Sequence, residues 1–162
     1  MMADVNIRRA TLADVCLLAE LNKDVQQIHA DAYPNVFKQP DNFAEIVADF
    51  ETRILADVDG FVFIVEAERQ AVGYIYARAV TRPENAYTHV QKLMIVDQIS
   101  VRPAYHNKGY GHRLMQAVRE VAAEQGIQRI QLDTYAFNAN AQQFYANLGF
   151  ERVSVRLALD FQ

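Results

Sequence analysis

Apolar residues recur along this chain with two different spacings, and each spacing predicts a type of element. Spacings of three and four residues predict helices over 11–32, 42–54, 110–125 and 139–147. Alternating or continuous apolar runs predict strands over 4–9, 61–66, 71–80, 90–101, 130–134 and 153–161. Strands and helices are mixed along the whole chain, with no repeat and no linker between domains. We therefore expect a single α/β domain over residues 1–162.

The junction between the strand over 90–101 and the next helix carries the strongest chemical signal. A loop with Gly109 and Gly111 joins the two elements. Such a loop exposes backbone N–H groups beside the positive end of a helix dipole, which favours a phosphate or pyrophosphate. The spacing matches neither a Walker loop nor the G-x-G-x-x-G dinucleotide fingerprint, because Leu114 stands at the last position. An ordinary strand-to-helix turn is the alternative interpretation.

Two segments of the chain carry ordered motifs. The first segment reads Arg102-Pro103-x-Tyr105-x-x-Lys108-Gly109-Tyr110-Gly111-x-x-Leu114, and the second reads Asn138-x-x-Ala141-x-x-Phe144-Tyr145-x-x-x-Gly149-Phe150. In this order they resemble motifs of the GNAT (GCN5-related N-acetyltransferase) superfamily. His106 departs from the family pattern, because Gln or Arg usually stands there. The resemblance implies an α/β fold with a central mixed, mostly antiparallel sheet flanked by helices.

The resemblance also implies acetyl-CoA as co-substrate, with transfer of the acetyl group directly to a primary amine of a small molecule or peptide. Carried over from the family motifs, the residues expected to hold acetyl-CoA are Ile99, Ser100, Val101, His106, Asn107, Lys108, Gly109, Tyr110, Gly111, His112 and Asn138. Ile99 or a neighbour would offer a backbone N–H to the thioester carbonyl. Lys108 could instead be a solvated side chain, and Asn138 could instead cap a helix.

Two residues are expected to move protons. Tyr145 aligns with the family tyrosine that often protonates the departing thiolate, although it could also be a packing residue. Asp97 stands where relatives often carry an acidic residue that takes the amine proton, and Gln98 beside it is expected to face the opposite side. A carboxylate has an ordinary pKa near 3.9, so burial or a water relay would be needed. Asp133 is a reserve candidate, and a paired or solvated Asp97 is the alternative.

The acceptor pocket is expected in the loop that follows the first helix. Its predicted lining residues are His29, Tyr33 and Phe37, with Asp31, Pro34, Tyr76 and Tyr87 as further contributors. Taken alone, His29 near a helix end would more often be a surface or capping residue than a base.

Composition narrows the class of protein. A net charge of −4 and a pI near 5.5 argue against nucleic-acid binding. The scattered histidines predict no metal site, and no apolar run or leader pattern predicts a membrane segment. We expect a cytoplasmic protein. Cys16 is the single cysteine, and its apolar neighbours predict a buried thiol.

Two other functions compete with acetyl transfer. One is an acyl-CoA-binding regulatory or interaction module with little or no activity, and the other is a nucleotide or phosphate-metabolite binder that uses the same loop. The second motif argues against the latter. Because relatives often dimerise, a homodimer is a further expectation.

Overall fold

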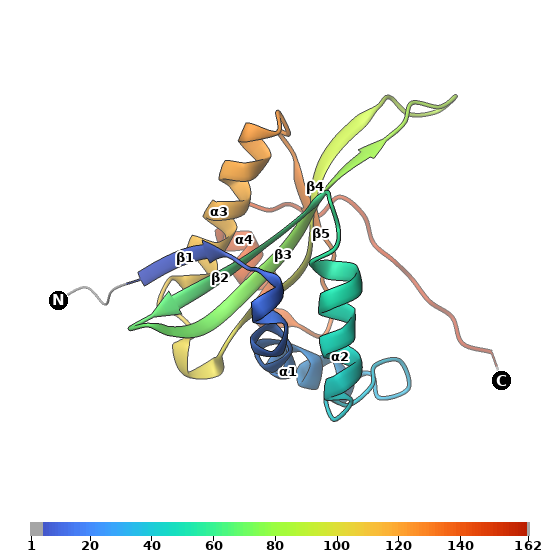
Figure 1. Ribbon diagram of the computed structural model, residues 1–162. Helices are drawn as coiled ribbons and strands as arrows, with labels where there is room; N and C mark the ends of the chain where they lie inside the picture. Colours follow the sequence, from blue (N-terminus) through green and yellow to red (C-terminus); the bar gives the residue numbers. More distant parts are fainter. Residues whose placement is uncertain (1–4, 162) are drawn as a thin grey trace.

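A computed structural model describes residues 5–161 of the chain (Figure 1). The strands are β1 (Val5–Arg9), β2 (Gly60–Ala67), β3 (Gln70–Arg82), β4 (Gln91–Val101) and β5 (Ile130–Leu132). The helices are α1 (Val15–Ala32), α2 (Phe43–Asp49), α3 (Tyr110–Glu124) and α4 (Ala139–Asn147). Short turns η1 (Leu12–Asp14) and η3 (Pro103–Tyr105) precede α1 and α3, and a π-helical turn η2 (Phe50–Ile54) extends α2.

The strands form one five-stranded sheet in the order β1-β2-β3-β4-β5. The first four strands pair antiparallel, and β5 pairs parallel to β4. This confirms the expected mixed, mostly antiparallel sheet. A parallel pair needs a crossover, and α3 supplies it between β4 and β5.

Helices cover both faces of the sheet, and alternate strand residues point to each face. Tyr74 and Tyr76 of β3 pack against α1, α2 and η2 on one face. Ile75 and Ala77 pack against α3 on the other face, where Tyr145 of α4 joins the same cluster. The helix stripe predicted from the sequence is buried as expected, through Leu114, Met115, Val118 and Ala122.

Three predictions fail in the structure. Residues 153–161 form no strand: this segment has no secondary structure, and its side chains are exposed. β5 ends at Leu132 rather than at residue 134. Cys16 is exposed rather than buried, because the buried stripe of α1 runs through Leu18, Leu21 and Asn22.

Candidate active site

A β-bulge in β4 sets the direction of the predicted catalytic carboxylate. Tyr76 pairs with Gln98 and Ala77 pairs with Val96, so Asp97 is the extra residue on β4. The Gln98 side chain accepts a hydrogen bond from the Tyr74 hydroxyl at 2.7 Å, and Asp97 accepts one from Arg78 at 2.6 Å. Tyr74 and Arg78 lie four residues apart on β3 and share a face. The bulge therefore turns Asp97 and Gln98 to the same face, and the prediction that they face opposite sides is wrong.

Beyond the bulge, one edge of β4 is open. β5 pairs with Met94, Ile95 and Val96 only, so over residues 97–101 β4 has β3 on one side and no described strand on the other. Alternate backbone groups of such an edge point away from the sheet and can bind an extended ligand. Ile99 and Val101 pack against the α3 cluster. The Ser100 hydroxyl donates to Leu21 O at 2.9 Å, so its side chain ties β4 to α1 and only its backbone can face a ligand.

The loop before α3 has the backbone shape of an anion site. Asn107 and Gly109 both have positive φ, of 59° and 84°. Gly109 is the N-cap of α3, and within the described chain no side chain caps this helix and no acidic residue lies in its first turn. The first backbone N–H groups of α3 are therefore left for a ligand, in the positive end of the helix dipole. These features fit a pyrophosphate.

Four side chains of this loop and of the first turn of α3 lie in different environments. The His106 ring donates from Nε2 to Val101 O at 2.6 Å, so this side chain folds back onto the end of β4. The Lys108 ammonium lies over the Tyr105 ring, 5.0 Å from its centroid. The exposed His112 ring contacts Phe144 of α4 edge-on. Buried Tyr110 belongs to the α3 cluster, so only its backbone can face a ligand.

Gly111 is packed closely against α4. A Cβ at this position would lie 2.9 Å from Cζ of Phe144. A larger residue at this position would therefore press on α4.

The second motif places Asn138 and Tyr145 at the two ends of α4. Asn138 Oδ1 accepts from the Ala141 N–H at 3.0 Å, which is the N-cap interaction named as the alternative. The amide nitrogen of the same side chain can still donate to a ligand. Tyr145 packs between Phe144 and Phe150 and joins the cluster that holds Ile99 and Val101. Burial raises the pKa of Tyr145 to about 12, so its phenol keeps its proton at neutral pH.

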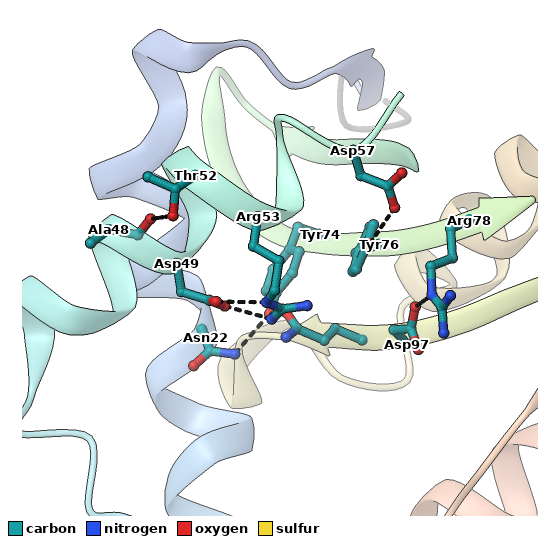
Figure 2. A network of polar contacts seen from close by, with 11 residues as sticks. Asn22, Ala48, Asp49, Thr52, Arg53, Asp57, Tyr74, Tyr76, Arg78 and Asp97 are labelled. Carbon is teal, nitrogen blue, oxygen red and sulfur yellow. Dashed lines mark hydrogen bonds and ion pairs between the residues drawn. The ribbon is translucent and has the colours of Figure 1, made fainter. Parts of the chain in front are cut away.

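Charged and phenolic groups line the face of the sheet that packs against α1 (Figure 2). Asp97 pairs with Arg78, and neither side chain is buried. Tyr76 donates to Asp57 at 2.8 Å, and burial together with this hydrogen bond raises the pKa of Tyr76 well above its ordinary value.

The remaining predicted residues lie apart from the acceptor loop. Tyr76 is buried in the sheet, and Tyr87 is exposed in the turn between β3 and β4. Asp133 is exposed directly after β5.

The predicted acceptor residues lie together in a cluster of five rings. His29, Tyr33 and Phe37 come from the end of α1 and the turn after it, and Tyr135 and Phe137 come from the segment after β5. Neighbouring ring centroids lie 5.0–5.7 Å apart. Tyr33 and Tyr135 are the exposed members. The sequence reading missed Tyr135 and Phe137, although two aromatic residues directly after a strand were a usable signal.

His29 has a fixed orientation in this cluster. Its Nδ1 lies 2.7 Å from Val25 O, and a carbonyl oxygen can only accept, so Nδ1 carries the hydrogen. In the neutral ring, Nε2 is then a hydrogen-bond acceptor.

Residues 5–161 contain neither a metal-binding cluster nor a membrane-spanning helix. No group of three or more His, Cys, Asp or Glu side chains could hold a metal ion there. None of the helices in this range is long and apolar enough to cross a membrane.

Known proteins are similar to this chain in sequence and in fold. The model of the acetyltransferase (GNAT) family matches residues 22–150. An uncharacterized N-acetyltransferase of Bacillus subtilis, YhfO, is 23% identical over 147 residues, covering 91% of this chain and 90% of the relative. Among solved structures, the tetramutant of the BH1408 protein from Bacillus halodurans has a TM-score of 0.86 at 22% identity, with 96% and 99% of the two chains covered. The aminoglycoside N-acetyltransferase AAC(6')-Iy, solved in complex with CoA, has a TM-score of 0.78 at 20% identity and coverage of 100% and 97%.

The chain therefore has the fold and the sequence signature of an acyltransferase. It belongs to the acetyltransferase (GNAT) family, since the family model spans most of its length, including both motifs.

Proposed function

We propose that this protein transfers the acetyl group of acetyl-CoA directly to a primary amine of a small molecule or peptide. The observation that carries this proposal is that two features lie next to each other, one at the start of α3 and one at the edge of β4. The α3 N-terminus after β4 lacks a side-chain cap, and the β4 edge beyond the bulge is open. Together they suit a ligand that joins an anionic end to an extended amide-bearing arm.

The backbone of residues 107–112 and the open edge at residues 99–101 would bind acetyl-CoA. The N–H groups of the α3 first turn would bind pyrophosphate, with Lys108 as a nearby positive charge. Asn138 would donate from its amide nitrogen. Bound acetyl-CoA supplies a thioester carbon that an amine attacks, so that a C–N bond forms and the C–S bond breaks.

The two proton-handling residues lie on opposite faces of the sheet. Tyr145 belongs to the α3 face, and Asp97 pairs with Arg78 on the α1 face. This separation suits a reaction in which a thiolate leaves on one side and an amine arrives on the other. Tyr145 would give its phenol proton to the thiolate. With its pKa raised to about 12, the phenol is protonated at neutral pH, and its hydrogen bond stabilises the leaving sulfur before the proton moves.

The aromatic cluster is the proposed binding site for the amine. Ring faces attract a cation, and the exposed Tyr33 and Tyr135 present such faces to solvent. The acceptor Nε2 of His29 can receive a hydrogen bond from an ammonium group, since Nδ1 is held by Val25 O. AAC(6')-Iy acts on aminoglycosides by its name, and these are cationic amines. We extend this class, small cationic amines, to the present chain.

Asp97 is the proposed base that takes the amine proton. Its carboxylate is not buried, so water reaches it and can relay the proton. The expected burial is therefore absent, and the relay is the route that the geometry favours. Arg78 holds the carboxylate in place and would act as a positioning residue.

Calorimetric titration with acetyl-CoA tests the first half of this proposal. We expect selective binding of acetyl-CoA over ATP and NAD, and we expect Gly109→Val to weaken it because φ of 84° disfavours a branched side chain. Equal binding of ATP would instead support a nucleotide site. Binding of acetyl-CoA without turnover of any amine would favour the acyl-CoA-binding module.

A further inference from the structure

Three hydrogen-bonded side chains connect α1 to the bulge in β4. The Asn22 amide of α1 donates to the Tyr74 hydroxyl at 2.9 Å, and this hydroxyl donates to Gln98 Oε1 at 2.7 Å. Tyr74 is fully buried, Asn22 is 8% exposed, and Gln98 is only partly buried. Figure 2 shows Asn22 and Tyr74 on the same side of the sheet as Asp97. The connection therefore runs from the interior to the surface beside the proposed base.

The hydrogen bonds of Tyr74 fix which end of the Gln98 amide faces the interior. A phenol has one hydrogen, which Tyr74 gives to Gln98 Oε1, and its oxygen accepts from Asn22. Burial raises the pKa of Tyr74, so the hydroxyl keeps this hydrogen at neutral pH. Gln98 Nε2 forms no hydrogen bond within the described residues 5–161. Its two N–H donors are therefore left for solvent or for a ligand.

This connection orients Gln98 more than it stabilises the fold. Removing the Tyr74 hydroxyl and the Asn22 amide from water costs free energy, which hydrogen bonds between neutral groups largely offset. Apolar side chains of the same shape would pack there at nearly the same stability. What the polar groups add is one orientation of the Gln98 amide, since a flipped amide would meet the Tyr74 O–H with an N–H donor.

Gln98 lies beside the place where the amine is expected to react. The bulge turns Asp97 and Gln98 to one face, and neighbouring Cα atoms are about 3.8 Å apart. The next residue, Ile99, is expected to offer its backbone N–H to the thioester carbonyl. An acceptor whose amine passes a proton to Asp97 through water would therefore hold its next carbon atom near Gln98 Nε2. An N–H donor at that place can bind a hydroxyl or carbonyl oxygen of the acceptor.

We propose that Gln98 selects acceptors with an oxygen on the carbon next to the one that bears the amine, and that Tyr74 and Asn22 are positioning residues. The inference rests on the proposed function, because it concerns the amine that the site acetylates. 1,2-Amino alcohols and α-amino amides both carry such an oxygen, and simple alkylamines do not. Gln98 is thus a specificity-determining residue that binds the acceptor and moves no proton.

Three amines of similar size measure this selection: 2-aminoethanol, glycinamide and propylamine. The quantity compared is the ratio of kcat/KM for an oxygen-bearing amine to kcat/KM for propylamine, at saturating acetyl-CoA. Dividing each variant's ratio by that of the natural protein cancels the different basicities of the amines. Gln98→Leu should lower the ratio roughly 5-fold, the effect of one neutral hydrogen bond. The change should lie in KM rather than kcat, because the bond is made to the bound acceptor throughout the reaction.

Tyr74→Phe tests the positioning role. It keeps the ring that packs edge-on against Phe50, with centroids 5.7 Å apart, and removes only the group that orients Gln98. The ratio should fall as it does in Gln98→Leu. Tyr76→Phe is the matched control, since it removes a hydroxyl from the same face of β3 that donates to Asp57 instead. Its ratio should equal that of the natural protein. If Tyr74→Phe does not fold, Gln98→Leu decides, because that side chain is only partly buried.

The outcomes separate this inference from the proposed function. A fall in the ratio for 2-aminoethanol alone, or for glycinamide alone, would support selection and identify the oxygen as hydroxyl or carbonyl. Unchanged ratios in Gln98→Leu, or an equal loss for all three amines, would overturn selection by Gln98 and leave acetyl transfer standing. No acetylation of 2-aminoethanol or glycinamide by the natural protein, with acetylation of other amines, would do the same.

Discussion

The ring of Phe144 lies against Gly111, 2.9 Å from the place where a Cβ on Gly111 would be. This contact joins the first turn of α3, which is the proposed pyrophosphate site, to α4, which carries Tyr145. The two motifs of the sequence are thus packed directly on each other. A substitution in one motif is therefore expected to change the packing of the other.

Replacing Gly111 with Val should disturb α4. The added side chain would overlap the Phe144 ring, and overpacking of this kind typically costs about 1–3 kcal/mol. We expect a lower midpoint of thermal unfolding together with weaker acetyl-CoA binding in calorimetry. The double variant G111V/F144L should recover much of both, since Leu leaves room. Normal stability and affinity in G111V would show that this contact contributes neither to stability nor to acetyl-CoA binding.

Tyr145→Phe removes the proposed proton donor and keeps the ring that packs between Phe144 and Phe150. Turnover should fall by roughly 10²-fold or more, the usual contribution of a positioned acid, while acetyl-CoA affinity changes little. Steady-state kinetics at saturating substrates and calorimetry would measure the two effects separately. An unaltered kcat would remove Tyr145 from the mechanism.

Asp97→Asn should lower kcat and leave amine binding nearly intact. Without the base, the variant can use only the fraction of amine that is already deprotonated. Its rate should therefore rise about tenfold per pH unit below the amine pKa near 10, more steeply than the rate of the natural protein. The pH–rate profile is the measurement. Identical profiles for the variant and the natural protein would rule out a role for Asp97 as base.

His29→Gln gives the contrasting pattern. Loss of the acceptor Nε2 and of one ring of the aromatic cluster should raise KM for the amine with a smaller effect on kcat. Cys16→Ser is a suitable control, because Cys16 is exposed on α1 and touches none of this chemistry. A His29→Gln variant with unchanged KM for every amine tested would place the acceptor elsewhere.

The pair of Arg8 and Asp14 should make stability depend on pH. Hydrogen bonds from Arg8 lower the pKa of Asp14 to about 2, from an ordinary value of 3.8. A depressed pKa contributes stability above the ordinary value, and this contribution is lost as pH falls towards 2. Denaturant unfolding should show Asp14→Asn destabilised by about 2 kcal/mol at pH 7, and this difference should shrink near pH 2. A difference that is constant with pH would mean that the ion pair contributes nothing.

The sequence predicted the parts of the site that depend on local pattern. The glycine loop and the start of α3 follow from residues that are close in sequence, and so does the α4 motif. The end of α3 also depends on residues close in sequence. Gly126 follows the helix with a φ of 66°, and the Ile127 N–H donates back to Ala122 O.

The parts that failed depend on pairing between distant segments. The bulge at Asp97 arises from the register between β3 and β4, and it reverses the facing of Gln98 that simple alternation predicts. Residues 153–161 have a strand pattern but no described strand beside them, so alternation alone could not place this segment. The contribution of Tyr135 and Phe137 to the aromatic cluster needs the end of β5 to lie beside the end of α1.

Acetyl transfer itself is measured most directly by mass spectrometry of amines incubated with the protein and acetyl-CoA. A panel should hold an aminoglycoside, a polyamine, an amino acid and a peptide, with a no-enzyme control and the Y145F variant beside the natural protein. The account predicts an acetylated cationic small molecule, formed with equal release of CoA thiol and much more slowly by Y145F. Tight binding of acetyl-CoA with no acetylated amine across the panel would contradict it.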